Sequence, residues 1–175
     1  MDIPLEDFKK RYPRWVEESL PEFQEGKTKK YLEKYPFMVY EDVPFTPFQG
    51  KAGEKKLALI TTGGLYLRDR QPPFEIQSIH GDPSYREIPR TVRPEELAIA
   101  HGHYDQSLAE KDLNCIFPLW RLIELQIEGV LADLANTHYS FTYVNNIVPL
   151  MEVFIPQVIA KLKAEEVKAL FLVPV

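Results

Sequence analysis

The chain has 175 residues and a formal net charge of −5 at pH 7, and hydrophobic residues make up 45% of it. This length fits one domain with an additional arm, and the apolar content excludes a disordered chain. Nucleic-acid phosphates and anionic membrane surfaces require clustered Lys and Arg, so we expect neither as a partner of this acidic chain. No apolar run approaches the roughly 20 residues that span a bilayer.

Cys115 is the only cysteine of the chain. A single thiol forms neither an internal disulfide nor a zinc-finger ligand set, which favours a cytoplasmic protein. The N-terminal region mixes acidic and basic side chains and does not resemble a signal peptide. Because apolar residues follow Cys115, we expect its thiol to be buried and unreactive.

Residues 1–55 are expected to form an N-terminal helical arm and a connector. Aromatic side chains of the arm recur at the spacing of one helix face, at Phe8, Tyr12 and Trp15. Pro13 and Pro21 are expected to divide the arm into short helices. Residues 44–48, with the sequence PFTPF, are expected to be extended because a residue before proline avoids the helical region.

Residues 56–175 alternate short apolar runs with helical patterns. This alternation indicates an α/β fold with a mainly parallel sheet and flanking helices. Strands are predicted at residues 57–60, 95–100, 130–134 and 168–173. Helices are predicted at residues 118–128 and 147–164, the second with a kink at Pro156. The last strand is apolar and is expected to be central, so we expect the C-terminal part of the domain to be missing.

The first predicted strand runs into Thr61, Thr62 and Gly63. Ligands of open α/β sheets bind beyond the carboxyl ends of the strands, where backbone N–H groups of such a turn can hold an anion. A tight turn is the more common reason for the Gly63-Gly64 pair. Neither a dinucleotide-binding fingerprint nor a P-loop is present.

His101, His103 and Asp105 follow the second predicted strand at alternate positions. In an extended segment all three would point to one face, where they can bind zinc or iron. Such short spacings have a high false-positive rate, and hydrogen-bonded histidines near a strand end are the more common outcome. His138 follows the third predicted strand without motif spacing to this group.

Arg86 ends a polar turn with the sequence GDPSYR at residues 81–86. Its guanidinium can bind a substrate carboxylate through paired hydrogen bonds. A loop held together by ion pairs is the more common role of such a turn.

Several stretches in the same order resemble selenoprotein B of the glycine, betaine, sarcosine and D-proline reductases. The resemblance covers about residues 44–175. The stretches are PFTP at 44–47, LALITTGGLYL at 57–67, GDPSYREIP at 81–89, HGHYD at 101–105, KDLNCIFP at 111–118 and LFLVPV at 170–175.

This resemblance implies a redox subunit that cleaves small amines or amino acids reductively. In the family, a selenocysteine or cysteine follows the last strand and attacks a carbon next to the substrate nitrogen. A partner subunit carries a pyruvoyl group that holds the substrate amine, and thioredoxin-type reductants restore the redox residue. We therefore expect reductase partner subunits, and no cofactor in this chain itself.

The family's redox residue would come just after Val175, so we expect no catalytic residue within the chain and no activity from the chain alone. A UGA selenocysteine codon read as a stop would produce such a sequence, as would a deliberately shortened chain or a genuine short paralogue. The expected substrate-binding residues are Thr61, Thr62, Gly63, Arg86, His101, His103 and His138.

Two other functions remain open from the sequence. One is a metal-binding protein or hydrolase that uses His101, His103 and Asp105. The other is a non-catalytic binding or assembly module, including a homo-oligomer, that uses the aromatic arm as an interface.

Overall fold

The computed structural model describes residues 4–40 and 47–175. The chain divides into two compact units, Met1–Pro47 and Phe48–Val175. The connector predicted at residues 44–48 lies mostly outside the described residues, so its extended conformation stays a prediction.

The first unit contains two helices, α1 (Leu5–Gln24) and α2 (Thr28–Glu33), which confirms the predicted helical arm. α1 runs without interruption through Pro13 and Pro21. The prediction that these prolines divide the arm into short helices is therefore wrong.

Aromatic packing explains why α1 tolerates its two prolines. One face of α1 buries the side chains of Phe8, Tyr12 and Trp15. The indole N–H of Trp15 donates a hydrogen bond to the carbonyl oxygen of Tyr31, at 2.8 Å, and so joins α1 to the residues of α2. Burial of three large rings stabilises the helix by more than the missing proline N–H bonds cost.

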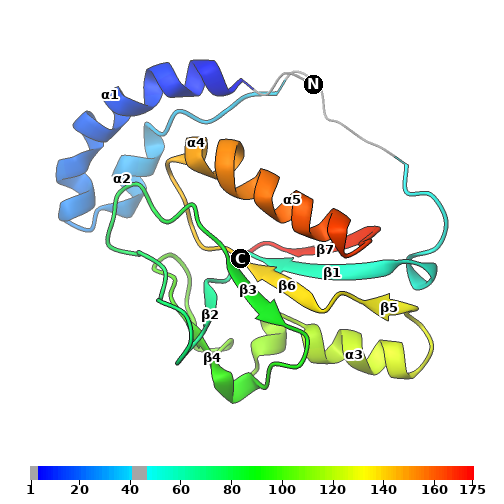
Figure 1. Cartoon of the computed structure of the whole chain (residues 1–175). Coiled ribbons are helices and arrows are strands. Elements are labelled where there is room, and N and C mark those ends of the chain that lie inside the picture. Colours follow the sequence, from blue (N-terminus) through cyan, green and yellow to red (C-terminus); the bar gives the residue numbers. More distant parts are fainter. Residues whose placement is uncertain (1–3, 41–46) are drawn as a thin grey trace. The chain divides into compact units, whose positions relative to one another are not determined.

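β1 (Lys56–Thr61) is the centre of a five-stranded sheet in the second unit (Figure 1). β5 (Asp133–Leu134) and β6 (Thr137–Ser140) pair in parallel with successive parts of β1 along one side. β7 (Ala169–Val173) pairs in parallel along the other side. β3 (Arg86–Pro89) pairs antiparallel with β6. The sheet is thus mainly parallel, as predicted.

A second, two-stranded antiparallel sheet consists of β2 (Leu65–Leu67) and β4 (Leu97–Ile99). The strand predicted at residues 95–100 therefore exists only in part, and it does not belong to the main sheet. Its first residues form a 3-10 helix, η2 (Pro94–Glu96), because Pro94 begins the turn and Glu96 caps it.

The strand predicted at residues 130–134 is displaced along the chain. Gly129 ends the preceding helix with a φ of 77°, and the residues after it form a turn. Strand pairing begins only at β5. β6, which has no apolar run in its sequence, pairs with the carboxyl end of β1. Its residues are Thr137–Ser140, and three of them are buried polar or aromatic side chains.

Helices cover both faces of the main sheet (Figure 1). α3 (Leu119–Ile127) follows Pro118 as predicted, after the 3-10 helix η3 (Leu113–Cys115). The helix predicted at residues 147–164 is present as three segments that follow one another without a break. They are α4 (Ile147–Pro149), the π-helical turn η4 (Leu150–Phe154) and α5 (Ile155–Ala164). Pro156 lies in the first turn of α5, where proline is tolerated, and the irregular turn precedes it.

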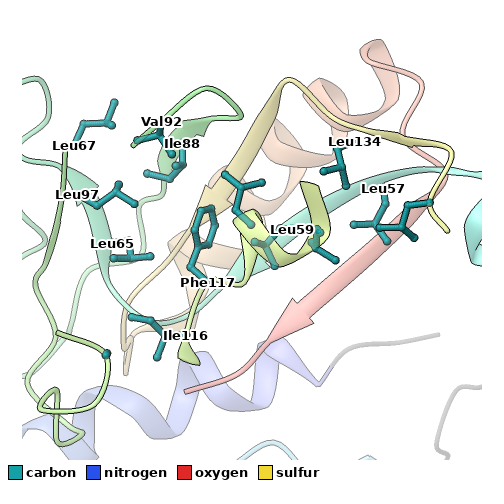
Figure 2. Close-up of a cluster of buried hydrophobic side chains, with 14 residues drawn as sticks. Leu57, Leu59, Leu65, Leu67, Ile88, Val92, Leu97, Ile116, Phe117 and Leu134 are labelled. Carbon is teal, nitrogen blue, oxygen red and sulfur yellow. The ribbon is translucent and has the colours of Figure 1, made fainter. Parts of the chain in front are cut away.

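Alternate residues of β1 supply two separate cores. Leu57 and Leu59 belong to the larger cluster (Figure 2). This cluster also contains Leu122 of α3. Ala58 belongs to the second cluster, together with Val158 of α5. Because successive residues of a strand point to opposite faces, β1 is buried on both sides of the sheet. Another 3-10 helix, η1 (Ala52–Glu54), precedes β1.

Candidate functional site

The carboxyl ends of several strands meet in one row at one edge of the main sheet. Thr61 of β1 pairs with Val173 of β7 on one side and with Ser140 of β6 on the other. Ser140 in turn pairs with Arg86 at the start of the antiparallel strand β3. This row is the edge at which α/β sheets bind their ligands.

The turn after β1 is fixed by close backbone contacts. The hydroxyl oxygen of the buried Thr61 accepts a hydrogen bond from the N–H of Gly63, at 3.0 Å. Gly64 has a φ of 73°, and a Cβ atom there would lie 2.4 Å from the carbonyl oxygen of Ala100. Only glycine fits this left-handed conformation and this close approach, so the Gly63-Gly64 pair forms a tight turn.

Thr62 joins the end of β7 to this turn. The backbone N–H of Thr62 donates to the carbonyl oxygen of Val173, at 3.2 Å. The hydroxyl oxygen of Thr62 accepts from the backbone N–H of Val175, at 2.9 Å. The chain that leaves β7 is therefore held beside residues 61–64.

His101 and His103 follow β4 and lie near this turn. The Nδ1 atom of His101 accepts from the backbone N–H of His103, at 3.1 Å, so the neutral ring of His101 carries its proton on Nε2. Burial lowers the pKa of His101 to about 4, and repulsion from His103 adds to this shift. Burial also lowers the pKa of His103, whose ring lies edge-on to Tyr143 with centroids 3.8 Å apart. Both imidazoles are neutral at pH 7.

Tyr104 fastens the histidine segment to the turn after β1. Its hydroxyl donates to the carbonyl oxygen of Gly63, at 2.9 Å, and burial raises its pKa to about 12. The ring of His101 lies 4.7 Å from that of Tyr104. Ala100 adds a backbone bond to the oxygen of Gly64, at 2.8 Å. The structure thus brings five of the predicted residues into one region: Thr61, Thr62, Gly63, His101 and His103.

Two tyrosines of this region were not singled out from the sequence. Tyr104 could have been found from the sequence, because it lies within the HGHYD stretch beside the two histidines, whereas Tyr143 has no motif around it. The hydroxyl of Tyr143 donates to the carbonyl oxygen of Ser78, at 3.0 Å, and so holds a distant loop against this end of the sheet.

His138 lies in the interior of the sheet and not at its carboxyl edge. Its side chain is fully buried in β6, and its Nδ1 atom accepts from the backbone N–H of Leu59, at 3.0 Å. Leu59 lies between the residues of β1 that pair with β5 and those that pair with β6. The imidazole of His138 therefore accepts the hydrogen bond that a neighbouring strand would otherwise accept from Leu59. Burial lowers the pKa of His138 to about 4, and its Nε2 atom finds no hydrogen-bond partner among the residues that the structure describes. Substrate binding by His138 stays a prediction.

Arg86 lies on the carboxyl edge, but its guanidinium holds the neighbouring loop. Nε donates to the carbonyl oxygen of Pro72, at 2.9 Å, and Nη2 to that of Pro73, at 3.2 Å. Nη1 donates to the hydroxyl of Ser84, at 2.8 Å, and a carboxylate oxygen of Asp82 lies 3.6 Å from Nη2. All three nitrogen atoms are thus engaged within the protein. An anion contact by Arg86 stays a prediction and would require some of these bonds to break.

Asp105 is exposed to solvent, and its carboxylate accepts from the backbone N–H of Ser107, at 2.9 Å. Across residues 4–40 and 47–175, no three His, Cys, Asp or Glu side chains are grouped closely enough to hold a metal ion. The structure therefore gives no support to a metal site built on Asp105 and the two histidines.

Cys115 is exposed, so the prediction of a buried thiol is wrong. Cys115 ends the 3-10 helix η3, and the chain enters the core only at the next residues, Ile116 and Phe117. The apolar residues after Cys115 are buried as expected, but Cys115 itself lies in η3 before the chain enters the core.

A cavity of about 930 Å³ lies beside the second sheet, and the sequence did not predict it. It is bordered by β2, β4, α3 and residues 106–114, with Arg68 and Trp120 among its lining side chains. Thr61, Thr62, His101 and His103 do not line it. The cavity is therefore separate from the edge where the predicted residues gather.

The fold and this edge define a mainly parallel α/β domain with a polar site at the carboxyl ends of its strands. The candidate site offers neutral imidazoles, hydroxyls and a tight glycine turn, which can hold a small polar molecule through hydrogen bonds. A family model described as glycine/sarcosine/betaine reductase selenoprotein B matches residues 23–174. The chain belongs to this family.

Curated relatives include subunits of several reductases. The chain is 30% identical to sarcosine reductase complex component B subunit beta of Peptoclostridium acidaminophilum, over 65% of the chain and 26% of the relative. It is 30% identical to D-proline reductase subunit gamma of Acetoanaerobium sticklandii, over 55% of the chain and 38% of the relative.

A third relative, glycine reductase complex component B subunit gamma of Symbiobacterium thermophilum, is 26% identical over 83% of the chain and 34% of the relative. The chain thus spans between about a quarter and two fifths of the curated relatives that it matches. No solved structure matches the chain. Along the described parts of the chain, none of the helices has the length and apolar character needed to cross a membrane.

Proposed function

We propose that this chain forms part of a reductase subunit that cleaves small amines or amino acids by means of a selenolate or thiolate. The observation that carries the proposal is the pair of hydrogen bonds between Thr62 and the end of β7. In the family that the sequence resembles, the redox residue follows this strand. A residue after Val175 would therefore lie beside the turn of residues 61–64.

The selenocysteine or cysteine would supply the nucleophile, and a pyruvoyl group on a partner subunit would hold the substrate amine. The residues of this chain would position the redox residue and hold the substrate through hydrogen bonds. Thr62 and the Gly64 turn fix the direction in which the chain leaves β7. The Nε2–H of neutral His101 can donate a hydrogen bond to a polar atom of the substrate, and burial keeps this ring uncharged near pH 7.

The family supports the class of substrate and the presence of partner subunits. The relatives are named as subunits of sarcosine, D-proline and glycine reductases, and two of the names describe components of a complex. We propose a small amine or amino acid as substrate and a multi-subunit complex as the working form. A thioredoxin-type dithiol would return the redox residue to its reduced state.

The experiment that tests this function compares the 175-residue chain with the chain extended through the codons that follow Val175. Each is mixed with the partner subunits and a dithiol reductant, and the reductive cleavage of glycine, sarcosine, betaine and D-proline is measured. We expect turnover only with the extended chain, and loss of turnover when its redox residue is replaced by serine. Turnover by the 175-residue chain alone would contradict the proposal.

A further inference from the structure

The cavity of about 930 Å³ beside β2 and β4 has the size of a small-molecule site. Its lining comes from separate parts of the second unit: β2, the residues in and before β4, residues 106–114 and α3. None of the lining side chains belongs to residues 169–175 or to the row of strand ends at the carboxyl edge. The cavity is therefore a candidate for a ligand of its own.

Part of the lining is apolar and aromatic. Tyr66 of β2 pairs with Ala98 of β4, and both residues line the cavity. Leu65 and Leu67, the neighbours of Tyr66 along β2, belong to the larger core, so Tyr66 lies on the other face of the strand. Trp120 of α3 is partly buried and also lines the cavity. Rings of this kind bind the flat apolar body of a ligand.

Two cationic side chains of the lining have no carboxylate partner among the residues that the structure describes. The guanidinium of Arg68 donates one hydrogen bond, from Nη2 to the carbonyl oxygen of Leu97 at 3.1 Å, and forms no ion pair. The ammonium of Lys111 forms neither a hydrogen bond nor an ion pair within the same residues. The remaining N–H groups of Arg68 can bind an oxyanion through paired hydrogen bonds.

The acidic side chains of the lining are mostly engaged within the protein. Glu124 accepts from Arg121 through both of its oxygens, at 2.9 and 2.8 Å. Asp112 accepts two hydrogen bonds from the asparagine two residues on, at 2.9 and 2.8 Å. Glu95 lies 3.5 Å from an arginine outside the cavity, which leaves the carboxylate of Glu110 without a partner in the described chain. The unpaired charges of the lining, two cations and one anion, therefore favour an anionic ligand.

We propose that this cavity binds a small organic anion, a carboxylate or phosphate group on a flat apolar body. The oxyanion accepts hydrogen bonds from the guanidinium of Arg68, and the ammonium of Lys111 adds positive charge beside it. The apolar body lies against Tyr66 and Trp120. The inference does not depend on the proposed reductase function, because no residue of the candidate site lines the cavity.

The fluorescence of Trp120 tests whether the cavity is occupied. The chain has two tryptophans, so Trp15→Phe leaves Trp120 as the only one. The probes are phenylacetate and phenyl phosphate, and benzylamine is the control because it carries the same ring with the opposite charge. We expect a saturable change with at least one of the anions and none with the amine, and the tighter anion identifies the preferred group. No saturable change with either anion, or an equal change with benzylamine, would overturn the proposal.

Arg68→Met removes the guanidinium that the proposal requires, and Arg70→Met is the matched control. Arg70 carries the same charge, pairs with Glu96 and does not line the cavity. In calorimetric titrations with the tighter anion, we expect Arg68→Met to weaken binding at least about tenfold. We expect Arg70→Met to change it by about twofold at most, because solvent and salt screen a charge outside the cavity. Equal effects of the two variants would mean attraction by net charge alone and would overturn the proposal.

Amide resonances locate the anion without any substitution. During titration with the tighter anion, we expect shifts at residues 66–68, 97–99 and 110–114. The turn at residues 61–63 should stay unchanged, because it does not line the cavity. Shifts confined to residues 61–63 and 101–103 would place the anion at the candidate site and would contradict the proposal.

A titration of a longer protein tests whether the cavity stays open in it. The chain spans only part of its curated relatives, so the calorimetric titration is repeated with the chain extended through the codons that follow Val175. We expect the extended chain to bind the anion with the same affinity. Loss of binding in the extended chain would show that further polypeptide fills the cavity, and would overturn the proposal.

Discussion

β1 and β7 have nearly the same apolar sequence but very different surroundings. Residues 57–60 read LALI and residues 170–173 read LFLV. β1 is paired on both sides and covered on both faces, and its residue Leu59 is fully buried. β7 is paired on one side only among the described strands, and Leu172 is largely exposed. An apolar run therefore predicts a strand without predicting its place in the sheet, because the neighbours come from distant parts of the chain.

The largest effect is expected at the carboxyl end of β1, from Gly64→Ala. The added Cβ would meet the carbonyl of Ala100 at 2.4 Å in a left-handed conformation, so we expect a loss of about 4 kcal/mol in the free energy of unfolding. Gly129→Ala is the control: its φ is 77°, but nothing lies within 4 Å of the new atom. A loss of only about 1 kcal/mol is expected there. Equal losses in urea unfolding would show that the contact with Ala100 does not matter.

The comparison of the two strands is tested directly by truncating one leucine in each. Leu59→Ala leaves a cavity in the larger core and is expected to cost about 3 kcal/mol. Leu172→Ala removes atoms that are mostly in water and is expected to cost less than about 1 kcal/mol in the monomer. Thermal or urea unfolding at low protein concentration measures both. Similar costs at the two positions would mean that β7 is as buried as β1.

Two buried histidines predict a pH dependence of stability. Burial lowers the pKa of His101 and of His138 to about 4, whereas an unfolded histidine has a pKa of about 6.5. Between these values the unfolded chain binds more protons, so stability is complete above about pH 6.5 and falls as the pH falls towards 4. The expected slope is at most about 1.4 kcal/mol per pH unit for each group.

His138→Asn sharpens this prediction, because the amide oxygen of asparagine can accept from the N–H of Leu59 in place of Nδ1. We expect the variant to lose the His138 contribution to the slope between pH 6.5 and 4, while His101 and His103 keep theirs. Unfolding at pH 7.5, where both histidines are neutral, measures the cost of the altered packing separately. An unchanged slope would show that His138 does not titrate in this range.

The smallest effect is expected at the link between the two strands. Thr62→Val removes the oxygen that accepts from the N–H of Val175, and we expect a loss of about 1 kcal/mol or less. The local effect is larger than the global one, since the amide of Val175 should exchange its hydrogen faster. Thr91→Val, at an exposed position, is the control and should leave that amide unchanged. Equal exchange in both variants would argue against the link.

The sequence predicted the elements whose signals are local. β1 and β7 are uninterrupted apolar runs, and α3 has a proline at its start and a glycine after its end. The position of β4 in a separate sheet depends on its pairing with β2, which no local pattern reveals. The continuous helix through Pro13 depends on burial of aromatic rings, which outweighs a local proline rule.

In the candidate site, too, residues with a local signal could be predicted, and those that depend on distant partners could not. Thr61, Thr62 and Gly63 were predictable because Thr61 ends an apolar strand and the other two directly follow it, and His101 because it follows β4. The roles of His138 and Arg86 depend on partners far along the chain or on loop carbonyls, namely Leu59, Pro72 and Pro73. Residue type alone therefore indicated a polar group but not whether it faces a ligand or the protein.

The most direct test of the proposed function is the genomic DNA that follows the codon for Val175. If the proposed redox role holds, we expect a selenocysteine codon, UGA, or a cysteine codon in frame after β7. The extended protein would then be the reductase subunit to assay. A reading frame with neither residue after β7 would contradict the proposed redox role of this chain.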